Sequence, residues 1–180
     1  ALPPDDAEMK TAWTECEAAG RLRGARGYAP PVTAPGDPSM LSTMQDFPLT
    51  IGMILRHGRT IHADREVSTF DGETVARSSF AAVAERIDRL GAALGRLGIG
   101  DGDRVGTFAW NHQQHLEAYF AVPCLGAVLH TLNVRLFPDQ LAYVANHGGD
   151  RVIIVDDVLV PVLAAVAARL PKVECYIVVG

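Results

Sequence analysis

Residues 120–157, FAVPCLGAVLHTLNVRLFPDQLAYVANHGGDRVIIVDD, decide the fold of the chain. Residues 126–131 are too few and too rich in β-branched side chains for a helix, which predicts a strand. Pro138 suits the first position of a helix, and Gly148 and Gly149 end it. Residues 151–155 form a nearly continuous β-branched run, which is typical of a parallel strand covered on both faces. The stretch therefore predicts a strand–helix–strand unit with a right-handed crossover.

The same alternation extends over the sequence from residue 78 to residue 180. Ser78 or Ser79 can cap a helix that carries a regular apolar stripe and is closed by Gly98. A strand at 104–109 and a helix at 112–125 follow, with Asn111 as the expected cap of that helix. Further along, the pattern predicts a helix at 159–170 and a strand at 173–179. Such alternation predicts an α/β fold, a mostly parallel sheet with helices on both faces.

The sequence before residue 78 has a different organisation. A short helix is expected at 50–56, followed by a β-hairpin whose strands, 66–70 and 73–76, are joined by Asp71-Gly72. Residues 1–39 are rich in proline and glycine, which favours a flexible N-terminal extension. A short docking helix within that extension is the alternative. The expected division is an extension at 1–39 and an α/β unit at 40–180.

Composition limits the classes of protein to which the chain can belong. A net charge of −5 and a pI near 5.6 argue against a nucleic-acid-binding surface. The 3 cysteines are odd in number and far apart, which favours reduced thiols over disulfides. The longest apolar run, at 158–168, contains Pro161 and is shorter than the roughly 18 residues that span a membrane. We therefore expect a cytoplasmic protein with no transmembrane segment.

Several blocks of the sequence resemble one enzyme family. The blocks are GDRV at 102–105, AWNH at 109–112, LEAYF at 116–120, LHTLNVRL at 129–136, DQLAYVANH at 139–147 and RVIIVD at 151–156. In this order they resemble the adenylate-forming acyl- and aryl-CoA ligases and luciferases, and among these the fatty-acyl-CoA synthetases. The resemblance covers roughly residues 40–180. One departure is Val134, where many members of the family have proline.

The resemblance implies an activity that belongs to a longer enzyme. A fatty-acid–CoA ligase uses ATP and Mg²⁺ to convert a fatty acid to acyl-AMP, and then transfers the acyl group to CoA. Members of the family grip the ATP phosphates with a Ser/Thr/Gly-rich loop ending in Pro-Lys-Gly. Here Pro171-Lys172 is followed by Val173, with no such loop before it. We therefore expect residues 40–180 to be the N-terminal α/β subdomain, truncated before that loop, with no catalytic residue and no activity alone.

Two alternatives and one further property remain open. The chain could be a stand-alone α/β module that binds a small ligand, or a non-catalytic dimerisation module. The family resemblance also implies a homodimer formed through the N-terminal region.

Candidate ligand contacts are His130, Thr131 and Asn133, which lie at and just beyond the carboxyl end of an expected strand. Open α/β sheets place ligands at this edge. The resemblance implies a contribution to the acyl or CoA channel of the complete enzyme. The alternative is that Asn133 and Arg135 only hold a loop by hydrogen bonds.

Three other motifs have structural interpretations that compete with functional ones. His112 and His115 share a helix face, but no third metal ligand stands nearby, which predicts a solvated helix start and no metal site. Asp156-Asp157 closes an expected strand, where a ligand group could lie, but the preferred interpretation is a polar strand end or a helix cap. The glycines between residues 95 and 106 run from helix into strand, the reverse of a phosphate-binding loop.

Overall fold

Four short apolar strands form a parallel sheet in the computed structural model, which describes residues 49–180. They are β3 (Arg104–Phe108), β4 (Val128–Thr131), β5 (Val152–Asp156) and β6 (Cys175–Val179). Their order across the sheet is β4-β3-β5-β6, so that β3 and β5 are the central strands. The expected parallel sheet is confirmed. The extension expected at residues 1–39 lies outside the described residues.

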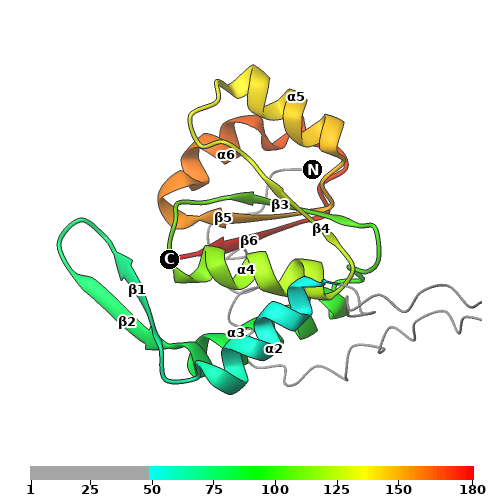
Figure 1. The fold of residues 1–180 in the computed structure, drawn as a ribbon. Helices are drawn as coiled ribbons and strands as arrows, with labels where there is room; N and C mark the ends of the chain where they lie inside the picture. Colours follow the sequence, from blue (N-terminus) through cyan, green and yellow to red (C-terminus); the bar gives the residue numbers. More distant parts are fainter. Residues whose placement is uncertain (1–48) are drawn as a thin grey trace, which may run out of the picture.

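Helices cover both faces of this sheet, as the alternation of the sequence predicts (Figure 1). On one side lie α2 (Ile51–Ile61), α3 (Phe80–Arg96) and α4 (Gln113–Cys124). On the other lie α5 (Pro138–Gly148) and α6 (Val160–Ala167), with a 3₁₀ turn, Asp157–Leu159, before α6. Each face buries its own apolar cluster, which accounts for the continuous apolar run of β5, a strand that is buried at every position.

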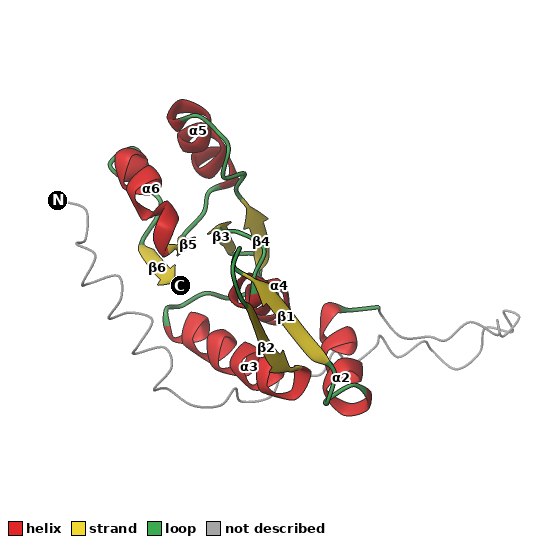
Figure 2. Cartoon of the chain, turned by 90° about the vertical axis from the view of Figure 1, so that its left-hand side faces the viewer, coloured by secondary structure: helices red, strands yellow, loops and turns green. Residues whose placement is uncertain are grey.

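A two-stranded antiparallel hairpin precedes the sheet and projects from the body of the protein (Figures 1 and 2). Its strands are β1 (Glu66–Phe70) and β2 (Val75–Ser79), so the second strand begins two residues later than the expected 73–76. The cause is Asp71, whose carboxylate accepts the backbone N–H groups of Glu73 at 2.9 Å and of Thr74 at 2.7 Å. These bonds hold the four residues in a turn and lower the pKa of Asp71 to about 2.

Two helix boundaries differ from the sequence-based prediction. The helix expected at 50–56 continues to Ile61, because Arg59 in its last turn donates to the Asp88 carboxylate of α3 at 2.8 Å. The cap of α4 is His112 and not Asn111, because the Nδ1 atom of His112 accepts the N–H of His115 at 3.2 Å. The expected cap of α3 is confirmed as Ser79.

Two further properties concern the cysteines and the lengths of the helices. The thiols of Cys124 and Cys175 are free and half-buried, and burial raises the pKa of both. Within residues 49–180, every helix is too short or too polar to cross a lipid bilayer.

Gly149 is the position where the end of α5 depends on glycine. Its φ of +73° lies in the left-handed region, and its N–H bonds to the carbonyl of Ala145. Gly149→Ala is expected to lower the free energy of unfolding by about 1–2 kcal/mol. The matched control is Gly95→Ala in α3, where nothing lies within 4 Å of an added methyl group and a gain of about 0.5–1 kcal/mol is expected. Urea unfolding of both variants checks this, and effects of the same sign would contradict it.

Candidate ligand-binding groove at the sheet switch point

The strand order creates a point where connections leave the sheet in opposite directions. From β3 the chain turns toward β4, and from β5 it turns toward β6, on the other side. The carboxyl ends of β3 and β5 lie next to each other, with Phe108 opposite Val155. Open α/β sheets bind ligands in the crevice outside such a switch point. The residues that directly follow these two strands are therefore the first candidates for a site.

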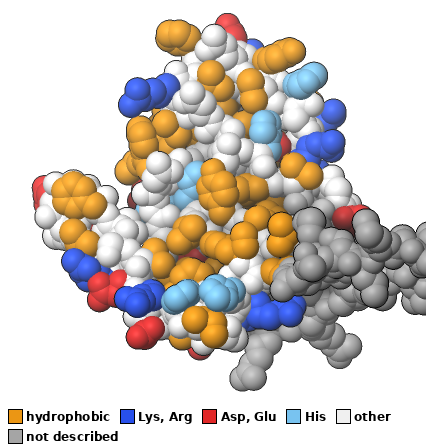
Figure 3. All heavy atoms as spheres, in the orientation of Figure 1, with side chains coloured by type: hydrophobic (Ala, Val, Ile, Leu, Met, Phe, Trp, Pro, Cys, Tyr) orange, Lys and Arg blue, Asp and Glu red, His pale blue; other side chains and the backbone are white. Residues whose placement is uncertain are grey.

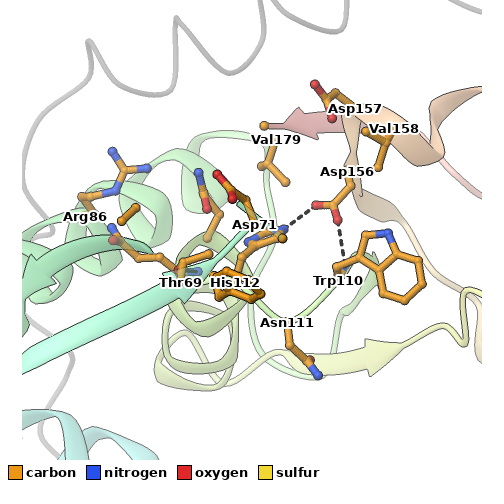
Figure 4. A pocket seen from close by; sticks show the side chains of 16 residues that line it. Thr69, Asp71, Arg86, Trp110, Asn111, His112, Asp156, Asp157, Val158 and Val179 are labelled. Carbon is orange, nitrogen blue, oxygen red and sulfur yellow. Dashed lines mark hydrogen bonds and ion pairs between the residues drawn. The ribbon is translucent and has the colours of Figure 1, made fainter. Parts of the chain in front are cut away.

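A groove lies at this edge of the sheet, with a volume of about 960 Å³. One wall is the tip of the β1–β2 hairpin, residues 69–72 with Ala76, and the other is the β3–α4 loop with the first residues of α4, residues 110–114. Residues 156–158 and 179–180, at the ends of β5 and β6, complete it together with Arg86 (Figure 4). We call this hollow the switch-point groove.

Asp156 holds the loop between β3 and α4 in place. Its side chain is buried, and its two oxygens accept from the backbone N–H of Trp110 at 2.7 Å and pair with Nε2 of His112 at 2.5 Å (Figure 4). Nδ1 of His112 accepts a backbone N–H, which leaves Nε2 as the ring nitrogen that donates to Asp156. Asp156 is thus the polar strand end that the sequence predicts, and it also clamps the loop after β3.

His115 lies inside the protein, so the expectation of a solvated helix start at 112–115 was wrong. Its side chain is buried between α4 and β3, with Nδ1 at 3.0 Å from the carbonyl oxygen of Trp110 and Nε2 at 3.0 Å from Oγ1 of Thr107. These two partners offset the cost of burying the ring, because each nitrogen keeps a hydrogen bond. Burial lowers the pKa of His115.

The lowered pKa of His115 predicts that stability falls in mild acid. Below its ordinary pKa of 6.5, unfolded His115 binds a proton that the folded protein takes up only at lower pH. The free energy of unfolding should then fall, by at most about 1.4 kcal/mol per pH unit, as the pH drops from 6.5 toward the folded pKa. His115→Gln should flatten this slope between pH 7.5 and 5.5 in urea unfolding. An unchanged slope would contradict the assignment.

Glu117 is a buried carboxylate that the sequence analysis missed. Its side chain is 1% exposed, and Oε1 accepts from Nε of Arg86 at 2.7 Å and from Nε2 of Gln113 at 2.8 Å. Oε2 has no hydrogen-bond partner among the described residues. In the sequence, the only sign of this buried carboxylate was a single glutamate among the apolar positions of α4. Because Arg86 and Gln113 both line the switch-point groove, Glu117 fixes two side chains of its walls.

The three residues expected to contact ligand lie outside the switch-point groove. His130 is half-buried on β4, and its Nδ1 lies 2.8 Å from the carboxylate of Asp150. Asp150 is buried, which raises its pKa, and the hydrogen bond with His130 offsets part of this rise. Thr131 is exposed at the end of β4. Asn133 is exposed and accepts the N–H of Arg135 at 2.9 Å. This is the loop-holding hydrogen bond that the sequence analysis gave as the alternative to ligand contact. These positions neither establish nor exclude ligand contact in a longer protein.

The chemistry of the switch-point groove favours binding over catalysis. Both ring nitrogens of His112 are engaged, so this ring cannot transfer a proton without losing a hydrogen bond. Among residues 49–180, no three His, Cys, Asp or Glu side chains are placed to hold a metal ion. The remaining charged groups at its surface are chiefly carboxylates, which disfavour a triphosphate.

Comparison with known proteins identifies the family. A family model described as "AMP-binding enzyme" matches residues 56–180. The chain belongs to the AMP-binding enzyme family. It is 43% identical over 138 residues to the long-chain-fatty-acid–CoA ligase of Thermus thermophilus, a match that covers 76% of this chain and 26% of that ligase. It is 39% identical over 142 residues to the 3-methylmercaptopropionyl-CoA ligase of Ruegeria lacuscaerulensis, covering 78% and 26%.

The fold of this AMP-binding family member agrees with that of a solved structure. The crystal structure of the anthranilate CoA ligase AuaEII with anthranoyl-AMP superposes with a TM-score of 0.68 at 24% identity, and covers 75% of this chain and 26% of that one. The α/β architecture is therefore confirmed, and the two curated relatives confirm the resemblance to CoA ligases. The chain spans about a quarter of the length of the curated relatives it matches, 26% in both cases.

Proposed function

We propose that this chain is the N-terminal part of a fatty-acid–CoA ligase that uses ATP and forms AMP. The observation that carries the proposal is the 43% identity to a long-chain-fatty-acid–CoA ligase across nearly the whole α/β unit. In such a ligase the fatty carboxylate attacks the α-phosphate of ATP, pyrophosphate leaves, and the thiol of CoA then displaces AMP. The compartment that we propose is the cytoplasm.

Residues 49–180 do not fit ATP or Mg²⁺ by themselves. No metal-binding cluster exists among residues 49–180, and the walls of the switch-point groove carry Asp71 and Asp157 rather than a cluster of cations. Pro171-Lys172 follows α6 and precedes β6, and a Gly-rich loop does not lead into it. The role that we propose for this segment is therefore structural: it forms a wall of the acyl channel and a platform for the adenylating part. Alone, it should be inactive.

Thioester formation by the complete ligase tests the proposed function. The complete enzyme is incubated with ATP, Mg²⁺, CoA and a series of unbranched acids from acetate upward, and acyl-CoA is quantified by chromatography. Longer acids should react better than acetate, because each buried methylene contributes about 0.8 kcal/mol. The 180-residue chain should release no pyrophosphate above a blank. Failure of every aliphatic acid to give a thioester would exclude a fatty-acid ligase.

We also propose that His130, Thr131 and Asn133 contact the acyl or CoA channel of the complete ligase. Thr131 is the best probe, because it is exposed at the end of β4. Thr131→Val should raise the KM for the acid or for CoA by roughly 2- to 10-fold, the range expected for one lost hydrogen bond. Thr60→Val on the distant α2 is the control and should change neither KM. Equal KM values for the two variants would argue against the contact.

We also propose that the complete ligase forms a homodimer through this N-terminal part. Exposed apolar side chains, including Ile51, Ile54 and Tyr119, gather over α2 and α4 (Figure 3). Apolar surface of this kind supports a protein–protein contact. Light scattering coupled to size exclusion measures the mass of the complete ligase, and a monomer at micromolar concentration would contradict the dimer.

A further inference from the structure

We propose that the switch-point groove binds the segment of the ligase that follows β6, and that this segment presents an apolar side chain next to a lysine or arginine. The inference rests on the proposed function, because it requires the longer enzyme.

The direction of β6 brings the chain to the switch-point groove. Because β6 runs parallel to β5, both strands end at the same edge of the sheet, with Val179 paired to Asp156. Val179 and Gly180 themselves line the groove. The backbone at Gly180 passes so close to Asp157 that an added Cβ would lie 2.6 Å from its carboxyl carbon. A continuing chain would therefore leave β6 along the wall of the groove, at high effective concentration.

The surface of the switch-point groove suits a polypeptide segment. Three large apolar side chains from different elements are exposed there: Phe70 at 66%, Trp110 at 48% and Val158 at 66%. Exposed apolar side chains gathered in one hollow indicate an interaction surface. Asp71 and Asp157 add exposed carboxylates to the same hollow, which favour a cationic partner (Figure 4).

Two polar residues of the switch-point groove are already paired within the protein. Small molecules are oriented by a few accessible polar groups in a concave site. In the switch-point groove, His112 and Asp156 already use their ring nitrogens and carboxylate oxygens on each other and on the backbone of the β3–α4 loop. The accessible lining consists of apolar surface, the carboxylates of Asp71 and Asp157 at its margin, and the side chains of Arg86, Asn111 and Gln114.

The hairpin independently supports a contact between its tip and a segment seated in the groove. It stands away from the body with a hollow between them (Figure 3). A hairpin of only two strands is marginal in water without packing against other elements. Phe70 at its tip is paired with Val75, and both side chains are exposed. A segment seated in the switch-point groove would cover Phe70 and stabilise this tip.

Site-specific thiol labelling of the complete ligase tests the proposal. Val158→Cys places a thiol in the switch-point groove, and Val162→Cys on α6 is the control, with native exposures of 66% and 40%. Labelling by a maleimide is followed at each site by peptide mass spectrometry, with rates in urea as the reference. If the segment is seated, V158C should react at least tenfold more slowly than V162C, although Val158 is the more exposed here. An equal or faster rate at V158C would overturn the proposal.

Two further arms separate the occupant from other causes of shielding. Asp157→Lys in the V158C enzyme should raise the labelling rate more than threefold, and Asp64→Lys, an exposed site outside the groove, should not. An unchanged rate with D157K would overturn the cationic character of the segment. If V158C labels rapidly once the enzyme is diluted to nanomolar concentration, a second copy of the chain covers the groove, and the proposal is overturned. An enzyme that forms acyl-CoA but labels rapidly at V158C would overturn this inference alone and leave the proposed function standing.

Discussion

Asp156→Ala is expected to lower the free energy of unfolding by about 2–5 kcal/mol, because it removes a buried carboxylate that accepts two hydrogen bonds. The carboxylate is buried at the end of β5, where it accepts the N–H of Trp110 and pairs with His112. Its removal leaves both donors without their acceptor, and each unsatisfied buried group costs about 1–3 kcal/mol. The loop between β3 and α4 should also become mobile.

The neighbouring carboxylate provides the matched control for Asp156. Asp157 follows directly in sequence but is exposed, and Asp157→Ala should change the free energy of unfolding by no more than about 0.5 kcal/mol. Urea unfolding followed by circular dichroism compares both variants with the unmodified chain. Similar effects of the two substitutions would mean that the clamp on the loop contributes nothing to the stability of the fold.

Phe108→Ala is expected to lower the free energy of unfolding by about 3–5 kcal/mol, because it leaves a cavity in a close-packed core. Phe108 ends the central strand β3, is 0% exposed, and belongs to the apolar cluster beneath α5 and α6. Phe137→Ala at the start of α5 is the control: that ring is 73% exposed, and its loss should change stability by about 0.5 kcal/mol or less. A loss below about 1 kcal/mol for F108A would contradict the tight packing of this face.

Local signals in the sequence were sufficient for most elements. The β-branched run of β5 and the proline at the start of α5 depend only on neighbouring residues, and both appear where they were predicted. The second strand of the hairpin begins later than predicted, because the side chain of Asp71 accepts hydrogen bonds from the backbone two and three residues later. That bond competes with the strand ladder, and apolar periodicity does not reveal it.

The candidate site depends on contacts that the sequence does not encode locally. Asp156 and the Trp110 loop are 46 residues apart and meet only because β5 lies beside β3, an order that alternation alone does not specify. The burial of His115 likewise depends on Thr107 of β3, and Glu117 depends on Arg86 of the preceding helix. His130, Thr131 and Asn133 were correctly placed at the carboxyl end of a strand, but that strand is β4, at the edge of the sheet.

Acid-dependent exchange between pyrophosphate and ATP is the most direct measurement of the proposed activity. Because formation of acyl-AMP from acid and ATP is reversible, labelled pyrophosphate should enter ATP only when a suitable acid is present. For the complete ligase without CoA, we predict exchange with a medium- or long-chain fatty acid well above the rate without acid. Complete ligase that is folded and binds ATP, but shows no acid-dependent exchange with any fatty acid, would contradict the proposed function.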